Sequence, residues 1–178
     1  MRVNYGQSVH GKSEIDEVVK VIKNSTQMGK KTKLFEKKIS ALFDKKYGLM
    51  VNSGSSALLL AYEVLPIPKG SNIITPVLTF ATTVSSMIKV GFIPNFVDVN
   101  NRSFCIDEKK IIQSINKNTK AISIPNLLGN LPNWKLIKKI AKKYNLLIIE
   151  DSADALGSKI DNCSSGRFSD ISITSFYG

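Results

Sequence analysis

The sequence predicts an α/β protein in three layers, with a mostly parallel β-sheet covered by helices on both faces. Short, almost wholly apolar segments alternate along the chain with amphipathic segments of helical periodicity. Strands that are apolar throughout are typical of a parallel sheet buried on both faces, and the intervening helices supply the crossovers that parallel strands need. The 178 residues, 43% of them hydrophobic, suffice for one domain with a sizeable core.

Two helices are predicted before this alternation begins. The first runs from Ser13 to Gln27, where Ser13 can cap the first turn and Glu14 and Asp16 suit the positive end of the helix dipole. The second covers Lys33 to Phe43. We therefore separate an N-terminal arm and helix, residues 1–32, from a large domain, residues 33–178.

Six apolar segments are then predicted as strands, with four amphipathic segments between them as helices. The predicted strands are 47–51, 72–76, 92–99, 121–124, 146–151 and 170–176. The predicted helices are 55–65, about 80–89, 107–115 and 133–144. The chain stops at the end of its last predicted strand, so we expect the element that covers this strand to lie beyond residue 178.

The net charge of +11 raises nucleic acid as a partner, but the kind and spacing of the basic residues exclude it. Only three of the 25 basic residues are arginine, and most lysines fall at polar positions of the amphipathic helices. Solvated helix faces explain such lysines. No aromatic residues interleave with them, as single-strand binding would require.

Membrane and metal partners are also not expected. No apolar run reaches the roughly 18 residues of a membrane span, and the N-terminus lacks the apolar region of a signal peptide. A cytoplasmic location is therefore predicted. Cys105 and Cys163 form neither a disulfide framework nor a metal-binding pattern, so free thiols are expected.

A candidate site lies where the predicted strands end, because ligands of open parallel sheets collect at the carboxyl edge. After the first predicted strand, Gly54, Ser55 and Ser56 open a helix. Backbone N–H groups and hydroxyls at a helix start can bind a phosphate, although a capping serine explains the same residues. Neither a P-loop nor a GxGxxG turn is present.

Three further segments end at the same edge. Phe80 follows the second strand and suits either the core or a flat wall against a planar ligand. Asp151 and Asp154 follow the apolar strand 146–151, where a carboxylate can pair with a protonated ring nitrogen or cap the next turn. Ser175 adds a hydroxyl after the last strand. This combination suits a phosphorylated planar cation, and pyridoxal phosphate fits that description.

Five ordered motifs resemble the DegT/DnrJ/StrS family of pyridoxal-phosphate nucleotide-sugar aminotransferases. The resemblance covers about Phe35 to Gly178, almost the whole chain. It implies the large domain of the aspartate aminotransferase fold, truncated, with the small C-terminal domain absent. The motifs are "NSGSSALLLA", "ITPVLTFATTVSSMIKVGFIPNFVDVN", "TKAISIPNLLGN", "IIEDSADALGS" and "SDISITSFYG".

The resemblance also implies a role for each candidate residue. Gly54, Ser55 and Ser56 would hold the cofactor phosphate, assisted by Ser175. Phe80 would stack on the pyridine ring, and Asp151 would pair with the ring nitrogen. Asp154 stands where the family usually has a glutamine near the ring hydroxyl, which is a departure from the pattern. The list of implied cofactor-binding residues is Gly54, Ser55, Ser56, Phe80, Asp151, Asp154 and Ser175.

Several motifs are most similar to the branch of this family that removes the sugar 3-hydroxyl. In that branch histidine replaces the lysine that forms the Schiff base, and pyridoxamine phosphate is the working cofactor. The deciding position would lie two residues after Gly178. Lysine there would imply an aminotransferase and histidine a dehydrase. His10, the only histidine, lies in the N-terminal arm.

Two functional hypotheses follow. In the first, this is the N-terminal half of an aminotransferase or 3-dehydrase acting on a nucleotide-linked 4-keto-6-deoxy sugar for surface polysaccharide, inactive alone and homodimeric when full length. In the second, it is a non-catalytic remnant that binds a phosphorylated ligand or a partner chain.

Overall fold

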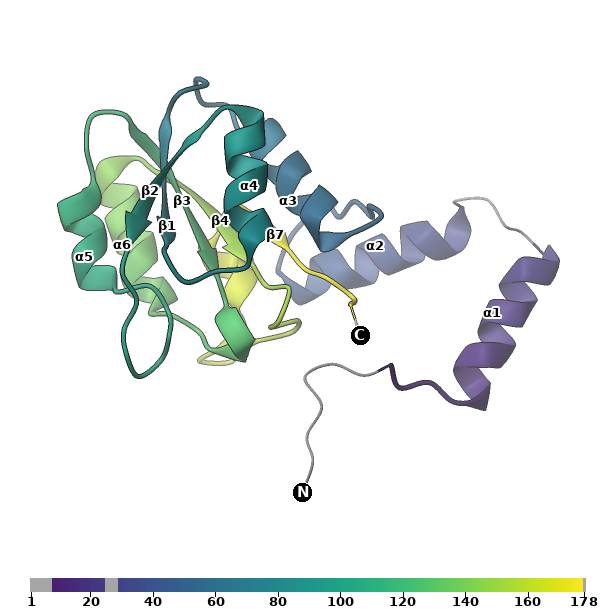
Figure 1. The fold of residues 1–178 in the computed structure, drawn as a ribbon. Coiled ribbons are helices and arrows are strands. Elements are labelled where there is room, and N and C mark those ends of the chain that lie inside the picture. The colour runs from purple at the N-terminus through teal and green to yellow at the C-terminus, as the bar shows by residue number, and fades with distance from the viewer. Residues whose placement is uncertain (1–7, 25–28, 178) are drawn as a thin grey trace.

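The computed structural model describes residues 8–24 and 29–177. Its centre is a five-stranded parallel sheet in the order β2-β1-β3-β4-β7 (Figure 1). The strands are β1 (Asn72–Pro76), β2 (Ile93–Val97), β3 (Thr119–Pro125), β4 (Leu147–Asp151) and β7 (Ile171–Ile173). A separate antiparallel pair, β5 (Lys159–Ile160) and β6 (Cys163–Ser164), forms a small hairpin that the sequence did not predict.

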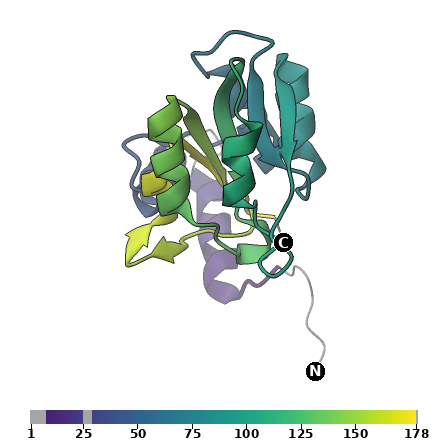
Figure 2. The same ribbon diagram turned by 90° about the vertical axis from the view of Figure 1, so that its left-hand side faces the viewer.

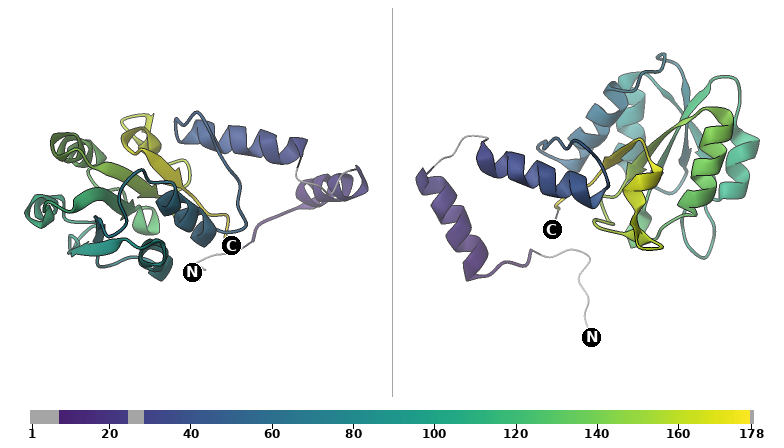
Figure 3. Two further views of the ribbon diagram at one scale, coloured as in Figure 1. Left: turned by 90° about the horizontal axis from the view of Figure 1, so that it is seen from above. Right: turned by 180° about the vertical axis from the view of Figure 1, so that it is seen from behind.

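Four helices cover the two faces of the sheet, and all but the first of them connect parallel strands. These are α3 (Gly54–Glu63), α4 (Ala81–Val90), α5 (Glu108–Ser114) and α6 (Trp134–Tyr144). α5 and α6 lie on the same face, which is turned toward the viewer in Figure 2. α3 and α4 lie on the opposite face, as the view from above in Figure 3 shows. The predicted three-layer α/β/α arrangement is therefore confirmed.

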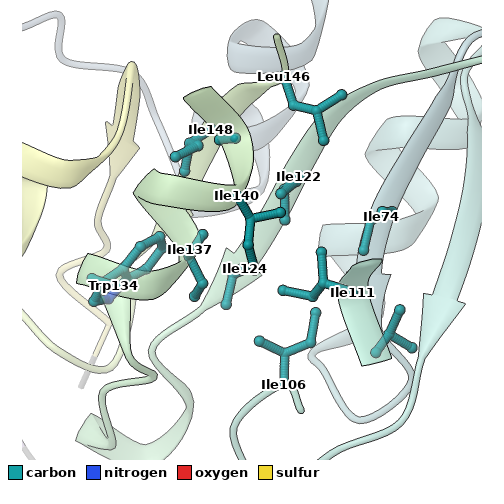
Figure 4. Close-up of a cluster of buried hydrophobic side chains, with 12 residues drawn as sticks. Ile74, Ile106, Ile111, Ile122, Ile124, Trp134, Ile137, Ile140, Leu146 and Ile148 are labelled. Atoms are coloured by element: carbon teal, nitrogen blue, oxygen red, sulfur yellow. The ribbon is translucent and has the colours of Figure 1, made fainter. Parts of the chain in front are cut away.

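Side-chain alternation along each strand builds two hydrophobic cores. Ile74, Ile122 and Ile148 point to the face covered by α5 and α6, where Trp134 and Ile137 pack against them (Figure 4). Their strand neighbours point to the other face, because successive side chains of a strand alternate. The second core contains Ile73, Ala121, Ile149, Ile173, Leu58, Ala61, Tyr62 and Met87.

The N-terminal helices stand apart from this body. α1 (Lys12–Asn24) lies away from the sheet (Figure 1) and contains no buried residue. Its apolar side chains Ile15, Val18, Val19 and Ile22 are all exposed. The residues predicted to complete this helix, up to Gln27, include 25–27, which lie outside the described residues. α2 (Lys30–Leu42) begins three residues earlier than predicted and ends against the sheet near Phe43, which is buried.

One predicted strand is wrong. Residues 47–51 belong to no strand in the described structure, although their composition suits one. The Met50 N–H donates to the Glu36 side chain of α2 at 2.9 Å, and Tyr47 and Leu49 are exposed. An apolar segment becomes a strand only where a neighbouring strand accepts its backbone hydrogen bonds, and here none lies beside it. The other five predicted strands are present, the one at 72–76 with the predicted ends and the other four with shifted ends.

In the described part of the chain, no helix is long and apolar enough to cross a membrane. The same residues contain no cluster of histidine, cysteine, aspartate or glutamate that could hold a metal ion.

Candidate functional site

A pocket of about 540 Å³ opens at the carboxyl edge of the sheet. It collects residues from five segments that are distant in sequence: the start of α3, the β1–α4 loop, and the ends of β3, β4 and β7. Six of the seven predicted cofactor-binding residues line it: Gly54, Ser55, Phe80, Asp151, Asp154 and Ser175. The seventh, Ser56, lies one residue further into α3.

The start of α3 confirms that a serine caps this helix. Ser53 is the N-cap, and its hydroxyl oxygen accepts from the Ser56 N–H at 3.1 Å. Its hydroxyl also contacts the Ser56 hydroxyl at 3.1 Å. Capping therefore occupies Ser56. The N–H groups of Gly54 and Ser55 have no intrahelical acceptor at this position, so they remain available to an anion in the pocket.

Gly54 is required by a close approach to the end of β7. A Cβ atom at Gly54 would lie 3.1 Å from Ser175 Cβ and 3.2 Å from Ser175 Oγ. A larger residue would require the helix start and the segment after β7 to move apart by a few tenths of an ångström. The two N–H groups of α3 and the Ser175 hydroxyl therefore gather on one side of the pocket.

Asp151 is the last residue of β4 and is only 5% exposed. Burial raises the pKa of its carboxyl, and the nearby Asp154 and Glu150 carboxyls raise it further. Hydrogen bonds from the Thr83 hydroxyl to Oδ2 (2.9 Å) and from the Ala153 N–H to Oδ1 (3.2 Å) act in the opposite direction. A buried carboxylate that lines a pocket without a cationic partner suits a cationic ligand.

Thr83 was not predicted from the sequence and is fully buried. The Tyr62 hydroxyl donates a hydrogen bond to the Thr83 carbonyl at 2.9 Å and lies 2.7 Å from Ser123 Oγ. These contacts position the backbone of Thr83. The signal that could have identified Thr83 is its place three residues after Phe80, one turn into the helix that leaves the same sheet edge.

Glu150 precedes Asp151 on β4 and points to the opposite face of the sheet. It is fully buried. Its Oε1 accepts from the Asn126 amide (2.9 Å) and the Ser152 hydroxyl (2.9 Å), and its Oε2 accepts from Ser169 (3.2 Å) and Ser172 (2.7 Å). Of these two neighbouring acids of β4, Glu150 therefore makes hydrogen bonds that stabilise the fold, and Asp151 faces the pocket.

Phe80 is not a core residue. It is 70% exposed and occupies the N-cap of α4 at the pocket wall. Beside it, the Thr79 hydroxyl oxygen is buried without a hydrogen-bond partner in the described structure. An aromatic face next to an unpartnered hydroxyl suits a planar ligand with polar substituents.

Asp154 is held by groups of the protein itself. Its Oδ2 accepts from the Leu128 N–H at 3.0 Å, and its Oδ1 accepts from the Tyr177 hydroxyl at 2.7 Å. Leu128 has a φ of 55°, an unusual conformation for leucine that this hydrogen bond helps to maintain. Asp154 therefore ties together the segments that follow β3, β4 and β7.

These features fit a pyridoxal-type cofactor. The free N–H groups at the start of α3 suit its phosphate, Phe80 suits its ring face, and the buried Asp151 suits a protonated ring nitrogen. The pocket volume lies within the usual range for small-molecule sites. No lysine is among the described residues that line the pocket.

An open parallel sheet with such a pocket at its carboxyl edge defines the chain as the large-domain part of a pyridoxal-phosphate aminotransferase fold. Residues 9–178 match the DegT/DnrJ/EryC1/StrS aminotransferase family, and the chain belongs to this family. Its members include pyridoxal-phosphate-dependent sugar aminotransferases and dehydratases that act on nucleotide sugars.

Individual relatives agree with this assignment. Lipopolysaccharide biosynthesis protein RfbH of Salmonella typhimurium is 41% identical over 151 residues, which are 80% of this chain and 35% of that protein. The structure of Helicobacter pylori PseC, an aminotransferase involved in pseudoaminic acid biosynthesis, superposes with a TM-score of 0.91 at 31% identity. That match covers 98% of this chain and 47% of PseC.

A dehydratase matches as well. Escherichia coli GDP-4-keto-6-deoxy-D-mannose-3-dehydratase, solved with bound hydrated pyridoxal phosphate, superposes with a TM-score of 0.83 at 29% identity. The match covers 92% of this chain and 44% of the dehydratase. The chain thus spans about half the length of the solved relatives, or less.

Proposed function

We propose that this chain is the cofactor-binding half of a nucleotide-sugar aminotransferase or 3-dehydratase and that it binds pyridoxal or pyridoxamine phosphate at the carboxyl edge of the sheet. One observation carries the proposal: Asp151 and the Gly54–Ser55 turn line the same pocket of about 540 Å³. In that arrangement, one molecule of cofactor size reaches both groups. The division into an arm (1–32) and a cofactor-binding domain (33–178) is part of this proposal.

Each residue has a proposed task at the cofactor. The N–H groups of Gly54 and Ser55, with the Ser175 hydroxyl, bind the phosphate, and Ser56 completes the capped turn that presents them. Phe80 stacks on the ring. Asp151 pairs with the ring nitrogen and keeps it protonated.

Asp154 has a proposed task at the edge of the cofactor ring. In this position it fixes the Leu128 turn and the Tyr177 side chain beside the ring hydroxyl.

The bound cofactor would supply an electron sink for bonds broken at the sugar carbon. A proton must also be moved, and the described pocket offers no lysine for this. We therefore propose that the chain binds cofactor but does not turn over alone, and that the residue that transfers the proton comes from the part of the relatives that this chain does not span.

The substrate in this proposal is a nucleotide-linked 4-keto-6-deoxy sugar used for surface polysaccharide. The support is the match to proteins named for lipopolysaccharide biosynthesis and for a GDP-linked 4-keto-6-deoxy sugar. A cytoplasmic location and a homodimer of the complete protein belong to the same proposal.

Calorimetric titration with pyridoxamine phosphate tests the cofactor site. We expect saturable binding that weakens at least tenfold in Asp151→Asn, because the neutral amide does not pair with the ring cation. The matched control is Asp161→Asn, which removes a carboxylate on the exposed β5–β6 turn, far from the pocket lining. Equal affinity in Asp151→Asn and in the unaltered chain would overturn the assignment.

A further inference from the structure

The pocket at the carboxyl edge of the sheet carries two negative charges and no positive one. The carboxylates of Asp151 and Asp154 line it, and no lysine, arginine or histidine is among the described residues of its lining. Neither carboxylate forms a salt bridge in the part of the chain that the structure describes. They lie close enough together for the Asp154 carboxyl to raise the pKa of Asp151. A ligand with a single positive centre at Asp151 therefore leaves the charge of Asp154 without a cation.

Asp154 keeps the capacity to bind a further donor. Its oxygens accept one hydrogen bond each, from the Leu128 N–H at 3.0 Å and from the Tyr177 hydroxyl at 2.7 Å. A carboxylate oxygen can accept two such bonds. Both present donors are neutral, so they orient the carboxylate without neutralising it. Asp154 is half-buried, and an ion pair in such a place is stronger than in bulk water.

The proposed cofactor supplies a second positive centre in only one of its forms. In both forms the ring nitrogen pairs with Asp151. The substituent beside the ring hydroxyl differs: the aldehyde of pyridoxal phosphate is neutral, whereas the aminomethyl group of pyridoxamine phosphate is protonated at neutral pH, as a lysine is. Asp154 has its proposed place at that edge of the ring, so its charge can pair with the amine and not with the aldehyde.

We infer that Asp154 selects the amine form of the cofactor over the neutral aldehyde form. This selection rests on the proposed cofactor site and adds to it the residue that decides which form is bound. The ammonium group gains a charge-assisted hydrogen bond to Asp154. A neutral substituent displaces water from the carboxylate without offering a cation in return. The chain therefore binds the cofactor that already carries an amino group.

Two ligands that differ only at this substituent test the selection. Pyridoxine phosphate has a hydroxyl where pyridoxamine phosphate has an amine, and unlike the aldehyde it does not react with surface lysines. Calorimetric titration of the full 178-residue protein with each ligand at neutral pH gives the ratio of the two affinities. We expect the amine to bind at least tenfold more tightly. A purely structural disturbance of the pocket weakens both ligands alike and does not change this ratio.

Three variants identify the residue that sets the ratio. Asp154→Asn removes the charge and keeps an oxygen that accepts from the Leu128 N–H, and we expect it to make the two affinities equal by weakening the amine. Asp151→Asn weakens both ligands by a similar factor, because both carry the ring nitrogen, and the preference for the amine persists. The control, Asp161→Asn, lies outside the pocket lining and leaves both affinities unchanged.

The outcomes separate this selection from the proposed function. Equal affinities of the unaltered protein for the two ligands would overturn the selection and leave the proposed cofactor site in place. A preference for the amine that survives in Asp154→Asn, or that Asp151→Asn abolishes to the same extent, would also overturn it. Failure of both ligands to bind would instead overturn the proposed function, and the selection with it.

Discussion

At the scale of single residues, the neighbouring acids Glu150 and Asp151 of β4 have different surroundings and therefore different roles. Strand alternation turns Glu150 toward four neutral hydrogen-bond donors and turns Asp151 toward the pocket. Two donors, from Thr83 and Ala153, reach Asp151, and burial raises the pKa of its carboxyl. A cation in the pocket would therefore gain more from Asp151 than from an exposed aspartate.

The raised pKa of Asp151 predicts a pH-dependent affinity for pyridoxamine phosphate. As the pH falls through that pKa, the carboxyl of the free protein becomes protonated and no longer pairs with the ring cation. Affinity should therefore decline at a higher pH than for an ordinary aspartate, whose pKa is about 3.9. Calorimetric titrations at a series of pH values from about 5 to about 8, above that ordinary pKa, measure the decline in affinity.

Asp151→Asn is the control, because it retains the titration of the cofactor phosphate and removes that of the carboxyl. A pH profile shared by both proteins contradicts the prediction.

Asp151→Asn should also raise the melting temperature of the cofactor-free protein at neutral pH. A folded-state pKa above the unfolded value means that the favourable contribution of Asp151 is present below the unfolded pKa and is lost as the pH rises through the folded pKa. At neutral pH the buried, ionised carboxylate therefore destabilises the fold, and the amide removes this cost. Differential scanning calorimetry should find the increase in melting temperature at pH 7 and no increase at a pH of about 3.9, the ordinary pKa of aspartate. A melting temperature of Asp151→Asn below that of the unaltered chain at pH 7 contradicts the prediction.

Thr83 is expected to position Asp151. Thr83→Val removes the hydroxyl that donates to Oδ2 and should cost about 1–3 kcal/mol of unfolding free energy, because the buried oxygen then lacks that donor. Thr83→Ser keeps the donor and should lose less. Urea unfolding measures both, and pyridoxamine phosphate should bind more weakly to Thr83→Val than to Thr83→Ser. Equal affinity in the two variants would assign Thr83 a purely structural part.

At the scale of elements, the site depends on how closely α3 and β7 approach each other. α3 begins at Gly54 because Ser53 caps it, and β7 brings Ser175 to within van der Waals distance of that glycine. The edge strand β7 pairs with β4 on one side only, and its end borders the pocket at the carboxyl edge of the sheet.

Gly54→Ala tests this approach. The new methyl group meets Ser175 at 3.1–3.2 Å, so α3 and β7 must separate by a few tenths of an ångström. We expect pyridoxamine phosphate to bind about tenfold more weakly, about 1.4 kcal/mol, although alanine itself favours a helix. In a Ser175→Gly background the contact is absent, and Gly54→Ala should then change affinity little. Additive losses in the double variant contradict the prediction.

At the scale of the whole molecule, the Glu150 cluster joins parts of the chain that are far apart in sequence. Asn126 links Glu150 to Trp134, whose indole N–H donates to the Asn126 side chain at 2.9 Å. On the other side, Ser169 also accepts from Lys45, which donates to the Gly166 carbonyl at 2.7 Å. Lys45 is half-buried, and burial lowers the pKa of its ammonium group.

Glu150→Ala should therefore destabilise the whole domain. It removes the acceptor shared by the Asn126 amide and the Ser152, Ser169 and Ser172 hydroxyls, and each buried donor that finds no other acceptor costs about 1–3 kcal/mol. The Ser169 hydroxyl keeps the Gly166 carbonyl as an acceptor at 3.1 Å. Glu150→Gln retains one acceptor oxygen and should lose less. Urea unfolding compares the two variants with the unaltered chain. A loss for Glu150→Ala below that of Glu150→Gln would show that the cluster contributes nothing as an acceptor.

The sequence by itself determined the fold class, the alternation of the five parallel strands with helices, and the family. Each of these depends on local patterns: apolar runs for buried strands, helical periodicity between them, and five motifs in fixed order. It also placed Asp151 and Ser175 at one edge of the sheet, because the carboxyl ends of parallel strands meet there. Gly54 lines the same pocket, but the strand 47–51 from which its place was predicted is not present in the described structure.

Only the tertiary structure decided which of these residues touch and which local patterns fail. Residues 47–51 have the composition of a strand, yet a strand also needs a neighbour to accept its hydrogen bonds, and none lies beside them in the described structure. The contacts of Thr83 with Asp151 and of Tyr177 with Asp154 likewise join positions 68 and 23 residues apart. No local pattern encodes such contacts, since they arise only when the packed sheet brings distant segments together.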